Sequence, residues 1–339
     1  MALQKFPGFI DIHVHLREPG ATQKEDFKTG TRAAIKGGFT FVCDMPNNLM
    51  CPTITPNRLQ EKIALTGVKA FCDVGFHYGT DGKNLESFPT AFRNPRVFGL
   101  KVYCSRTTGE LLITDSSTLD HIFVAWESSK PILLHASGDL LQVALELAKK
   151  YSRRVHVCHV SQQSDLEIVR KAKESRHEVS CGVTPHHLFL IKDSELVKPP
   201  IGDEENQLAL WEGLKMRTID IVESDHAPHT KEEKLSGAQM FGVPGLETTL
   251  GLFCRSVHEK KLIMDDVLRL LYIMPKQIFN IPDQPSTYVE LDPSKPFIVG
   301  ADGYETKCGW SPFEGWELFG KVETVVIRKR PLVVDGRLV

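Results

Sequence analysis

The chain has 339 residues and is nearly neutral, with 41 Lys and Arg against 43 Asp and Glu. This balance argues against a nucleic-acid partner, and no apolar window reaches the length of a transmembrane helix, so we expect no membrane partner either. The eight cysteines include no C-x-x-C pair. In a chain long enough to bury a large core, this pattern is typical of reduced thiols in a cytoplasmic protein.

Apolar segments of strand length alternate with helical patterns over most of the chain. The expected helices are 24–36, 57–66, 116–128, 139–150, 163–175 and 206–215, and the expected strands are 8–12, 39–45, 69–76, 97–103, 131–135, 155–160, 177–183 and 219–224. Nearly continuous apolar strands indicate a parallel sheet covered on both faces, so we predict an α/β fold, specifically a (β/α)8 TIM-type barrel. A doubly wound open sheet is the alternative, but no Gly-rich nucleotide-binding motif follows the first strand. We expect the chain to begin directly at the first barrel strand.

The pattern changes after about residue 245. Two helices are expected at 246–258 and 265–281, followed by short strand-like segments at 287–290, 296–299, 322–328 and 331–335. Pro and Gly are frequent in this part. We therefore predict two domains, a catalytic barrel over 1–283 and a small β-rich appendage over 284–339 that packs on it.

Two histidines, His13 and His15, stand at the end of the first predicted strand. Side chains alternate across a strand, so the two imidazoles point to the same side and could hold a metal ion. Arg17, two residues further, would add an anion-binding fork beside that metal. On its own, the histidine pair is as compatible with a polar edge strand as with a metal site.

Four later side chains stand at the ends of other predicted strands, namely Lys101, His135, His159 and Asp225. Strand ends meet around the mouth of a barrel, and imidazole and carboxylate are ligands that zinc prefers, so together they predict a metal site. Lys101 has no lone pair as an ammonium ion. It either forms a salt bridge or, if desolvated and deprotonated, could capture carbon dioxide as a carbamate that bridges two metals.

The segments around these residues closely resemble the dihydroorotases of the amidohydrolase superfamily, and the resemblance covers nearly the whole chain. They are Gly8–Gly20, Met45–Asn47, Gly99–Tyr103, His156–Val160 and Ser224–Thr230. The dihydroorotase domain of the animal multifunctional pyrimidine-synthesis protein looks most similar. The resemblance implies a hydrolase of cyclic amides that reversibly closes N-carbamoyl-L-aspartate to (S)-dihydroorotate, with zinc, in de novo pyrimidine (UMP) biosynthesis.

The resemblance also implies a role for each matching residue. His13, His15 and Asp225 would hold one zinc ion, His135 and His159 the second, and N6-carboxylated Lys101 would bridge the two. Asp225 would be the general base for the attacking water, whose pKa zinc lowers, and then the acid for the leaving amide nitrogen. The substrate carboxylate would bind to Arg17, Asn47 and His229.

For three further segments, the resemblance implies a contact with the substrate, and an ordinary structural role is the alternative for the first two. Loop 105–111, with Thr107 and Thr108, would form a lid over the substrate, or is an ordinary loop. Phe241 and Gly242 would offer backbone groups to the ring, or form a helix-entry turn. Lys198 would offer only a backbone contact, because relatives have Asn or Arg there.

The chain departs from its relatives at three other positions. Cys158 stands where close relatives place a ligand for an extra zinc ion, but the acidic partner position is Gly182 here. We therefore do not expect a third zinc ion, and we interpret Cys158 as a buried structural thiol. Ser137 stands at a position that is commonly acidic.

Other functions share the predicted metal cage. Allantoinase and hydantoinase or dihydropyrimidinase are alternatives, although their substrates have no carboxylate that would need Arg17. A non-catalytic scaffold relative is a further alternative, although such proteins usually lose ligands and all six are present here. The relatives suggest a homodimer, and association with or fusion to aspartate transcarbamoylase.

Overall fold

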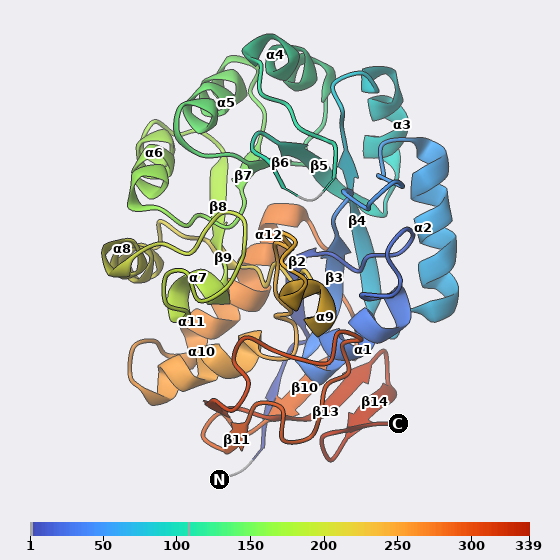
Figure 1. Ribbon diagram of the computed structural model, residues 1–339, viewed down its shortest axis with the longest axis vertical. Coiled ribbons are helices and arrows are strands. Elements are labelled where there is room, and N and C mark those ends of the chain that lie inside the picture. The colour runs from blue at the N-terminus through green and yellow to red at the C-terminus, as the bar shows by residue number, and fades with distance from the viewer. Residues whose placement is uncertain (1–2, 108) are drawn as a thin grey trace.

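The computed structural model describes residues 3–107 and 109–339, and its centre is a barrel of parallel strands (Figure 1). The strands follow one another in sequence order around the barrel: β2 (Phe9–Val14), β3 (Phe39–Asp44), β4 (Asp73–Gly79), β5 (Val97–Tyr103), β6 (Ile132–His135), β7 (Val155–Val157), β8 (Val179–Val183) and β9 (Ile221–Val222). The last strand returns to the first, because Val14 bridges His226 and the backbone N–H of His15 donates to the carbonyl of His226 at 2.8 Å. The predicted (β/α)8 fold is confirmed.

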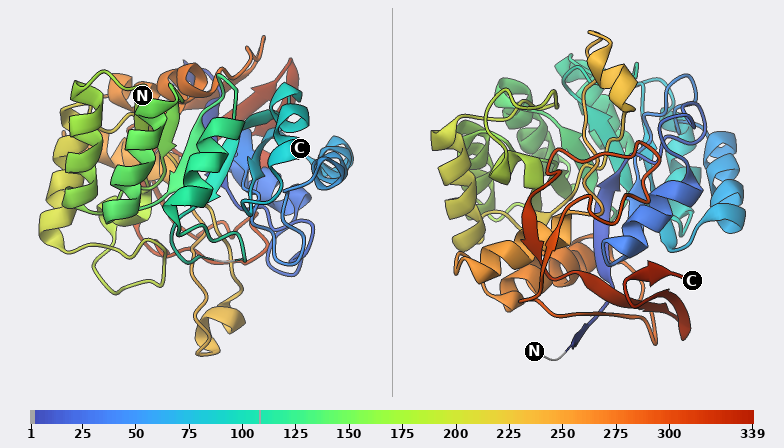
Figure 2. Two further views of the ribbon diagram at one scale, coloured as in Figure 1. Left: turned by 90° about the horizontal axis from the view of Figure 1, so that it is seen from above. Right: turned by 60° about the horizontal axis from the view of Figure 1, so that its bottom comes forward.

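Helices surround the barrel and cover its outer face (Figures 1 and 2). They are α1 (Phe27–Lys36), α2 (Pro56–Lys69), α3 (Phe88–Arg93) after the 3-10 turn η1 (Leu85–Ser87), α4 (Ser116–Ala125), α5 (Gly138–Lys150), α6 (Gln163–Glu174) and α8 (Glu204–Lys215). Helix α1 starts later than predicted because the side chain of Asp26 accepts from the backbone N–H of Thr29 and caps it. The short helices α7 (Pro185–Phe189) and α9 (Lys231–Leu235) lie in the loops after β8 and β9, and α9 projects from the barrel (Figure 2).

The barrel interior is apolar at one end. Ile12, Phe41 and Leu133 pack there against Ile278 and Phe279. These last two residues end a helical segment made of α11 (Met264–Leu268), the π-helical η2 (Arg269–Ile273) and α12 (Met274–Phe279). Apolar side chains thus fill most of this end, and the polar residues predicted for the site lie at the opposite end, where the strands finish.

The C-terminal part adds antiparallel strands after helix α10 (Thr249–His258), as predicted. One sheet has the order β1-β10-β13-β14-β15, and β11 pairs with β12. The bounds are β1 (Gln4–Phe6), β10 (Tyr288–Leu291), β11 (Pro296–Ile298), β12 (Glu317–Phe319), β13 (Val322–Ile327), β14 (Arg330–Val334) and β15 (Arg337–Leu338).

The expectation that the first barrel strand would be the first element is wrong. Strand β1 precedes it and pairs antiparallel with β10, with Lys5 opposite Glu290. Its three residues are too few to show a period, and the partner strand lies almost at the other end of the sequence. The N-terminal segment therefore belongs to the same sheet as the C-terminal strands.

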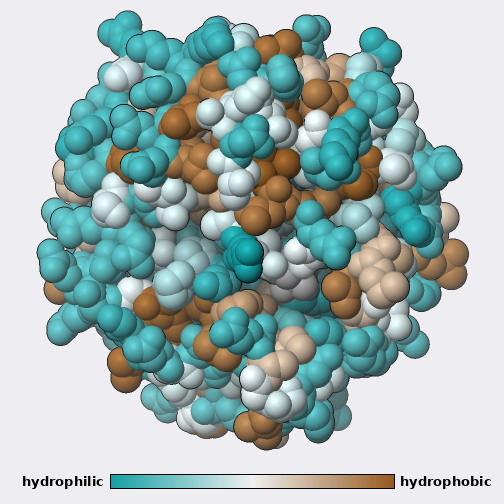
Figure 3. All heavy atoms as spheres, turned by 45° about the horizontal axis from the view of Figure 1, so that its top comes forward, coloured by the Kyte–Doolittle hydropathy of each residue, from teal (hydrophilic) through white to brown (hydrophobic). Residues whose placement is uncertain are grey.

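The exposed apolar side chains include several near the mouth of the barrel. Leu49, Met50, Leu112, Leu196 and Leu235 are all exposed in segments that follow the ends of barrel strands. On the face drawn in Figure 3, hydrophilic side chains dominate the edges and apolar ones gather nearer the middle. Among the described residues, every helix is too short or too polar to cross a membrane.

A buried ion pair joins helix α2 to β3, and the same carboxylate binds the loop after β2. Lys62 Nζ lies 2.6 Å from Asp44 Oδ2, both side chains are 1% exposed, and Asp44 Oδ1 accepts from the backbone N–H of Leu16 at 2.8 Å. Removing one partner leaves an uncompensated buried charge. We expect Lys62→Met to lower the free energy of unfolding by about 3 kcal/mol, measured by urea denaturation, with part of the loss recovered in Lys62→Met/Asp44→Asn. A loss below about 1 kcal/mol would contradict this.

Candidate active site

A pocket opens at the mouth of the barrel. Most of the residues predicted for the site line it, and all of these lie at or beyond the ends of barrel strands: His13, His15, Arg17, Asn47, Thr107, His135, His159, Lys198, Asp225, Phe241 and Gly242. Lys101 lies beneath the pocket and is fully buried. His229 lies behind Arg17, and Thr108 lies outside the described residues. Side chains that are far apart in sequence thus meet at one place.

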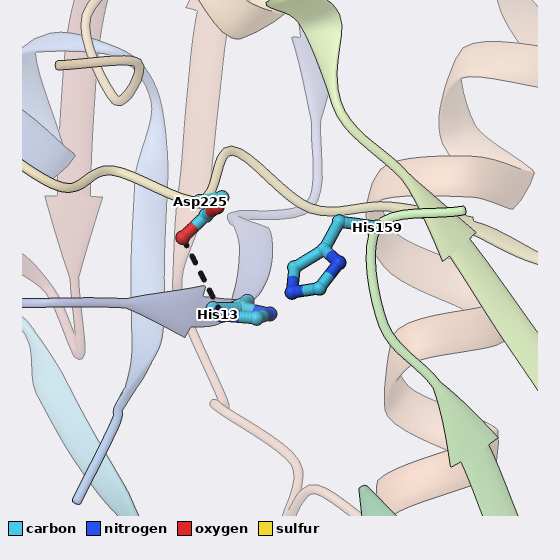
Figure 4. A group of neighbouring side chains, drawn as sticks. All are labelled: His13, His159 and Asp225. Atoms are coloured by element: carbon cyan, nitrogen blue, oxygen red, sulfur yellow. Dashed lines mark ion pairs between the residues drawn. The ribbon is translucent and has the colours of Figure 1, made fainter. Parts of the chain in front are cut away.

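Asp225 faces both histidines of the first strand. Its Oδ1 atom lies 3.1 Å from His15 Nε2 and 3.4 Å from His13 Nε2. Figure 4 shows Asp225, His13 and His159 turned toward one another, and one ligand atom of each lies within 4.8 Å of the other two. Two imidazoles and a carboxylate at this spacing form a donor set suited to zinc.

A second donor pair lies beside the first. His135 Nδ1 and His159 Nε2 face each other at 2.9 Å, and the His13 and His159 rings are 5.1 Å apart. Below them, Lys101 Nζ lies 3.0 Å from the Cys158 thiol. Among the described residues, none of the ion pairs involves Lys101. A buried ammonium that forms no ion pair is costly, so this environment suits a lysine that becomes an anionic metal ligand.

The electrostatics keep the imidazoles neutral. Burial, followed by the positive charge of Lys101, lowers the pKa of His135 to about 3 and that of His13 well below its ordinary value. For His159, burial and the neighbouring His135 act in the same direction on the pKa. Neutral imidazole keeps the lone pair that a metal needs. Burial and the carboxylate of Glu223 raise the pKa of Asp225 to about 8, and a cation beside it would pull this pKa down again.

Three of the site residues have left-handed backbone conformations. The φ angles are 61° at Arg17, 37° at His159 and 45° at Asp225. Such angles are uncommon outside glycine and cost of order 1–3 kcal/mol each unless neighbouring contacts hold them. The backbone N–H of His159 donates to the Glu223 carboxylate, and that of Ser224 donates to Asp11 at 3.2 Å. The sharp turns after β7 and β9 direct His159 and Asp225 into the mouth.

Two cations, Arg17 and Lys24, flank His229 on one side of the pocket, and Glu233 lies 3.2 Å from Lys24 Nζ. Arg17 Nε donates to the carbonyl of Pro228 at 3.2 Å, and its Nη2 lies 3.3 Å from His229 Nε2. Lys24 Nζ lies 3.0 Å from His229 Nδ1. Burial, and then the charges of Arg17 and Lys24, lower the pKa of His229 to about 3. A neutral imidazole between two cations leaves the guanidinium free to accept an anion.

The amino-acid sequence is similar to those of several known proteins. The model of the amidohydrolase family matches residues 5–184. The multifunctional protein CAD of Squalus acanthias is 39% identical over 99% of this chain, which spans only 15% of that protein. The dihydroorotase of Pyrococcus abyssi is 34% identical, over 98% of this chain and 84% of that enzyme. The chain belongs to the amidohydrolase family, in its dihydroorotase branch. The predicted resemblance is confirmed.

Solved structures place this amidohydrolase in the same fold. The L-hydantoinase of Arthrobacter aurescens superposes with a TM-score of 0.92 at 23% identity, covering 99% of this chain and 87% of that one. An inactive dihydroorotase-like domain of the CAD-like multifunctional protein of Chaetomium thermophilum gives a TM-score of 0.85 at 24% identity, covering 100% and 97%. At this identity the likeness establishes the fold alone.

The sequence interpretation missed two residues of the amidohydrolase site. Tyr103 lines the pocket, and its buried hydroxyl has no hydrogen-bond partner among the described residues. It stands two residues after Lys101 on the same strand, so strand alternation could have indicated it. Glu223, fully buried, falls within the predicted strand 219–224, where nothing in the sequence distinguishes it from a strand residue.

The position of Glu223 contradicts the reason for expecting no third zinc ion. That expectation rested on the missing carboxylate at Gly182. A Cβ atom added to Gly182 would lie 2.8 Å from both Cδ and Oε1 of Glu223, so Glu223 supplies a carboxylate to the same space. His13, Cys158 and Glu223 also lie within 4.8 Å of one another. The argument from Gly182 is therefore wrong, and the count of two metal ions stays a prediction.

Proposed function

We propose that this amidohydrolase is a dihydroorotase, which interconverts N-carbamoyl-L-aspartate and (S)-dihydroorotate in de novo pyrimidine biosynthesis. The observation that carries the proposal is Arg17, which is 8% exposed and lines the same pocket as the metal-donor set. A cyclic amide that also bears a carboxylate fits a pocket with both features. The relatives named dihydroorotase support the same substrate.

The donor set would hold two zinc ions. His13, His15 and Asp225 would bind one, His135 and His159 the other, and a carbamate on Lys101 would join them. Bound zinc supplies a polarised amide carbonyl and a water that ionises near neutral pH. The neutral imidazoles and the unpaired amine of Lys101 support this assignment.

Asp225 would move the proton. In the hydrolytic direction its carboxylate takes a proton from the attacking water and delivers it to the amide nitrogen as the C–N bond breaks. In the direction of ring closure the same carboxylate accepts the proton of the attacking nitrogen. Its place between His13 and His15 keeps it at the reacting atoms in both directions.

The substrate would be oriented from the Arg17 side. Arg17, with Asn47 and His229, would bind the free carboxylate, and backbone groups of Phe241, Gly242 and Lys198 would bind the ring. Thr107 would close over the substrate from the lid loop. The lid loop already lies close to Asn47, because a Cβ atom added to Gly109 would lie 3.4 Å from the carbonyl oxygen of Asn47.

We expect Arg17→Gln to raise KM for dihydroorotate roughly 10- to 100-fold, with a smaller change in kcat, because charge-assisted hydrogen bonds contribute about 1.5–3 kcal/mol. Arg17→Lys keeps the charge but loses the fork, and should give an intermediate KM. Steady-state kinetics on the zinc-loaded variants would measure this. An unchanged KM in Arg17→Gln would place the substrate carboxylate elsewhere.

A substrate panel tests the proposed function itself. The zinc-loaded protein should hydrolyse dihydroorotate and cyclise carbamoyl aspartate, and leave allantoin, hydantoin and dihydrouracil unchanged. Hydrolysis of one of these neutral rings without turnover of dihydroorotate would favour the allantoinase or hydantoinase alternative. No turnover of any of them would favour the scaffold alternative.

We further propose a cytoplasmic homodimer that associates with, or is fused to, aspartate transcarbamoylase. All eight cysteines are free thiols, which suits a reducing compartment. The match to segments of two multifunctional proteins supports the association. We also keep the division into a catalytic barrel over 1–283 and an appendage over 284–339 as a proposal.

A further inference from the structure

Glu223 is a buried carboxylate with an unusual set of partners. It follows β9 directly and is fully buried. Among the described residues, its ion pairs are with two histidines, His13 and His156. A fully buried carboxylate whose ion-pair partners are imidazoles rather than Lys or Arg requires a structural explanation.

One oxygen of Glu223 faces the ring of His13. The distance from Oε2 to His13 Nδ1 is 3.2 Å, while the other ring nitrogen, Nε2, points to Asp225. A carboxylate accepts hydrogen bonds, so the proton of the neutral ring belongs on Nδ1. The lone pair is then on Nε2, directed into the mouth, where a metal would use it.

The other oxygen of Glu223 fixes a second donor. Oε1 accepts from the backbone N–H of His159, the residue with the left-handed φ of 37°. This bond holds the turn that points the His159 ring toward His135. One carboxylate thus orients donors from two segments of the barrel, β2 and the turn after β7.

The packing leaves Glu223 no other position. Its backbone N–H donates to the carbonyl of Val183 on β8 at 3.1 Å, and its side chain fills the space beside Gly182. A Cβ atom at Gly182 would lie 2.8 Å from the Glu223 carboxyl carbon. A glycine at this place on β8 is therefore needed to admit a carboxylate from β9.

We propose that Glu223 is a positioning residue of the metal centre, which fixes the tautomer of His13 and the turn at His159 so that both present lone pairs to the metal. The inference rests on the proposed function, because it presumes that these histidines bind zinc. It adds a residue that touches neither metal nor substrate and acts through two that bind metal.

Zinc affinity of the metal-free protein, measured by competition with a chelator, tests the proposal. Glu223→Ala should weaken zinc binding roughly 10- to 100-fold, as loss of a carboxylate behind a metal-bound histidine typically does. Glu223→Gln keeps one acceptor and should weaken it less. The melting temperature of the metal-free variants should stay within a few degrees of the parent. Glu247→Gln, which alters a carboxylate that binds only the backbone N–H groups of Glu305 and Thr306, is the matched control.

Moving the carboxylate back one strand separates positioning from simple packing. Gly182→Glu alone should disrupt the site, because the new side chain meets Glu223. Gly182→Glu/Glu223→Ala places a carboxylate in the same space from β8 and should recover most of the zinc affinity lost in Glu223→Ala. Gly182→Met/Glu223→Ala fills the same space without a carboxylate, so it should recover the zinc affinity only if packing, and not positioning, is the role of Glu223.

The outcomes separate this inference from the proposed function. If the parent protein binds no zinc, the proposed function fails. If the parent binds zinc and Glu223→Ala binds it equally tightly, only the positioning role fails. Three zinc ions in the parent and two in Glu223→Ala would make Glu223 a ligand, which would also overturn the positioning role.

Discussion

Replacing Asp225 with asparagine is expected to lower kcat for dihydroorotate roughly 10³-fold, within the range that general acid–base catalysis contributes. The amide can still lie between His13 and His15, but it cannot take the proton from water or return it to the ring nitrogen. Much of the bound zinc should remain, because the imidazoles and Lys101 are unchanged. Steady-state kinetics in both directions, with zinc measured on the same sample, would check this.

A matched control for this variant is Glu195→Gln. Glu195 is a carboxylate near the mouth that pairs with Lys234 at 3.0 Å and does not line the pocket. Its replacement should leave turnover within about twofold of the parent. Near-native kcat in Asp225→Asn would show that another group moves the proton, and the assignment of Asp225 would be wrong.

Replacing Lys101 with methionine is the second change of large expected effect. Methionine matches the length of the buried stem but cannot form a carbamate, so the two metal positions lose their shared anionic ligand. We expect zinc content to fall below two per chain and turnover to fall roughly 10³-fold or more, since bound metal contributes several kcal/mol to the transition state. Metal analysis and kinetics would measure both effects.

The fold should survive this substitution. Lys101 forms no ion pair among the residues that the structure describes, so methionine leaves no carboxylate without an ion-pair partner and keeps the buried apolar stem. We expect an unchanged or higher melting temperature for metal-free Lys101→Met. Reloading the metal-free parent should also require bicarbonate, which supplies the carbamate. Full activity of Lys101→Met, or reloading that ignores bicarbonate, would rule out the bridging role.

Periodicity was sufficient to predict the barrel. The strand ends that carry Lys101 and His135 were placed within a residue because both lie in nearly continuous apolar runs. The short elements α3 and β1 were not predicted. A three-residue strand whose partner is about 285 residues away has no local signal, and only tertiary pairing makes it a strand.

The site was predicted from a simple geometric rule, that polar residues at parallel strand ends converge. The rule predicts that His13, His159 and Asp225 lie close together, and the structure shows that they do. It could not find Glu223, whose partner in space is the empty position at Gly182 on the neighbouring strand. The side chain of Glu223 fills the space that Gly182 leaves empty, and this relation is visible only in the folded structure.

The C-terminal segment also supports the mouth in a way that the sequence does not reveal. The indole N–H of Trp310 donates to the carbonyl of His229 at 2.7 Å, and Thr306 donates to the carboxylate of Glu25. Glu25 in turn lies 3.3 Å from His226, next to Asp225. Residues beyond the barrel thus hold the loop that carries Asp225.

Fold alone does not separate an active enzyme from a scaffold, since one structural neighbour is an inactive dihydroorotase-like domain. The most direct test is a crystal structure of the zinc-loaded protein with anomalous scattering at the zinc edge, combined with turnover measured against zinc added per chain. We predict two peaks at the mouth, bounded by the four histidines, Asp225 and a carbamate on Lys101, and dihydroorotate turnover that saturates at two equivalents. A mouth without zinc, or turnover independent of zinc, would contradict the account.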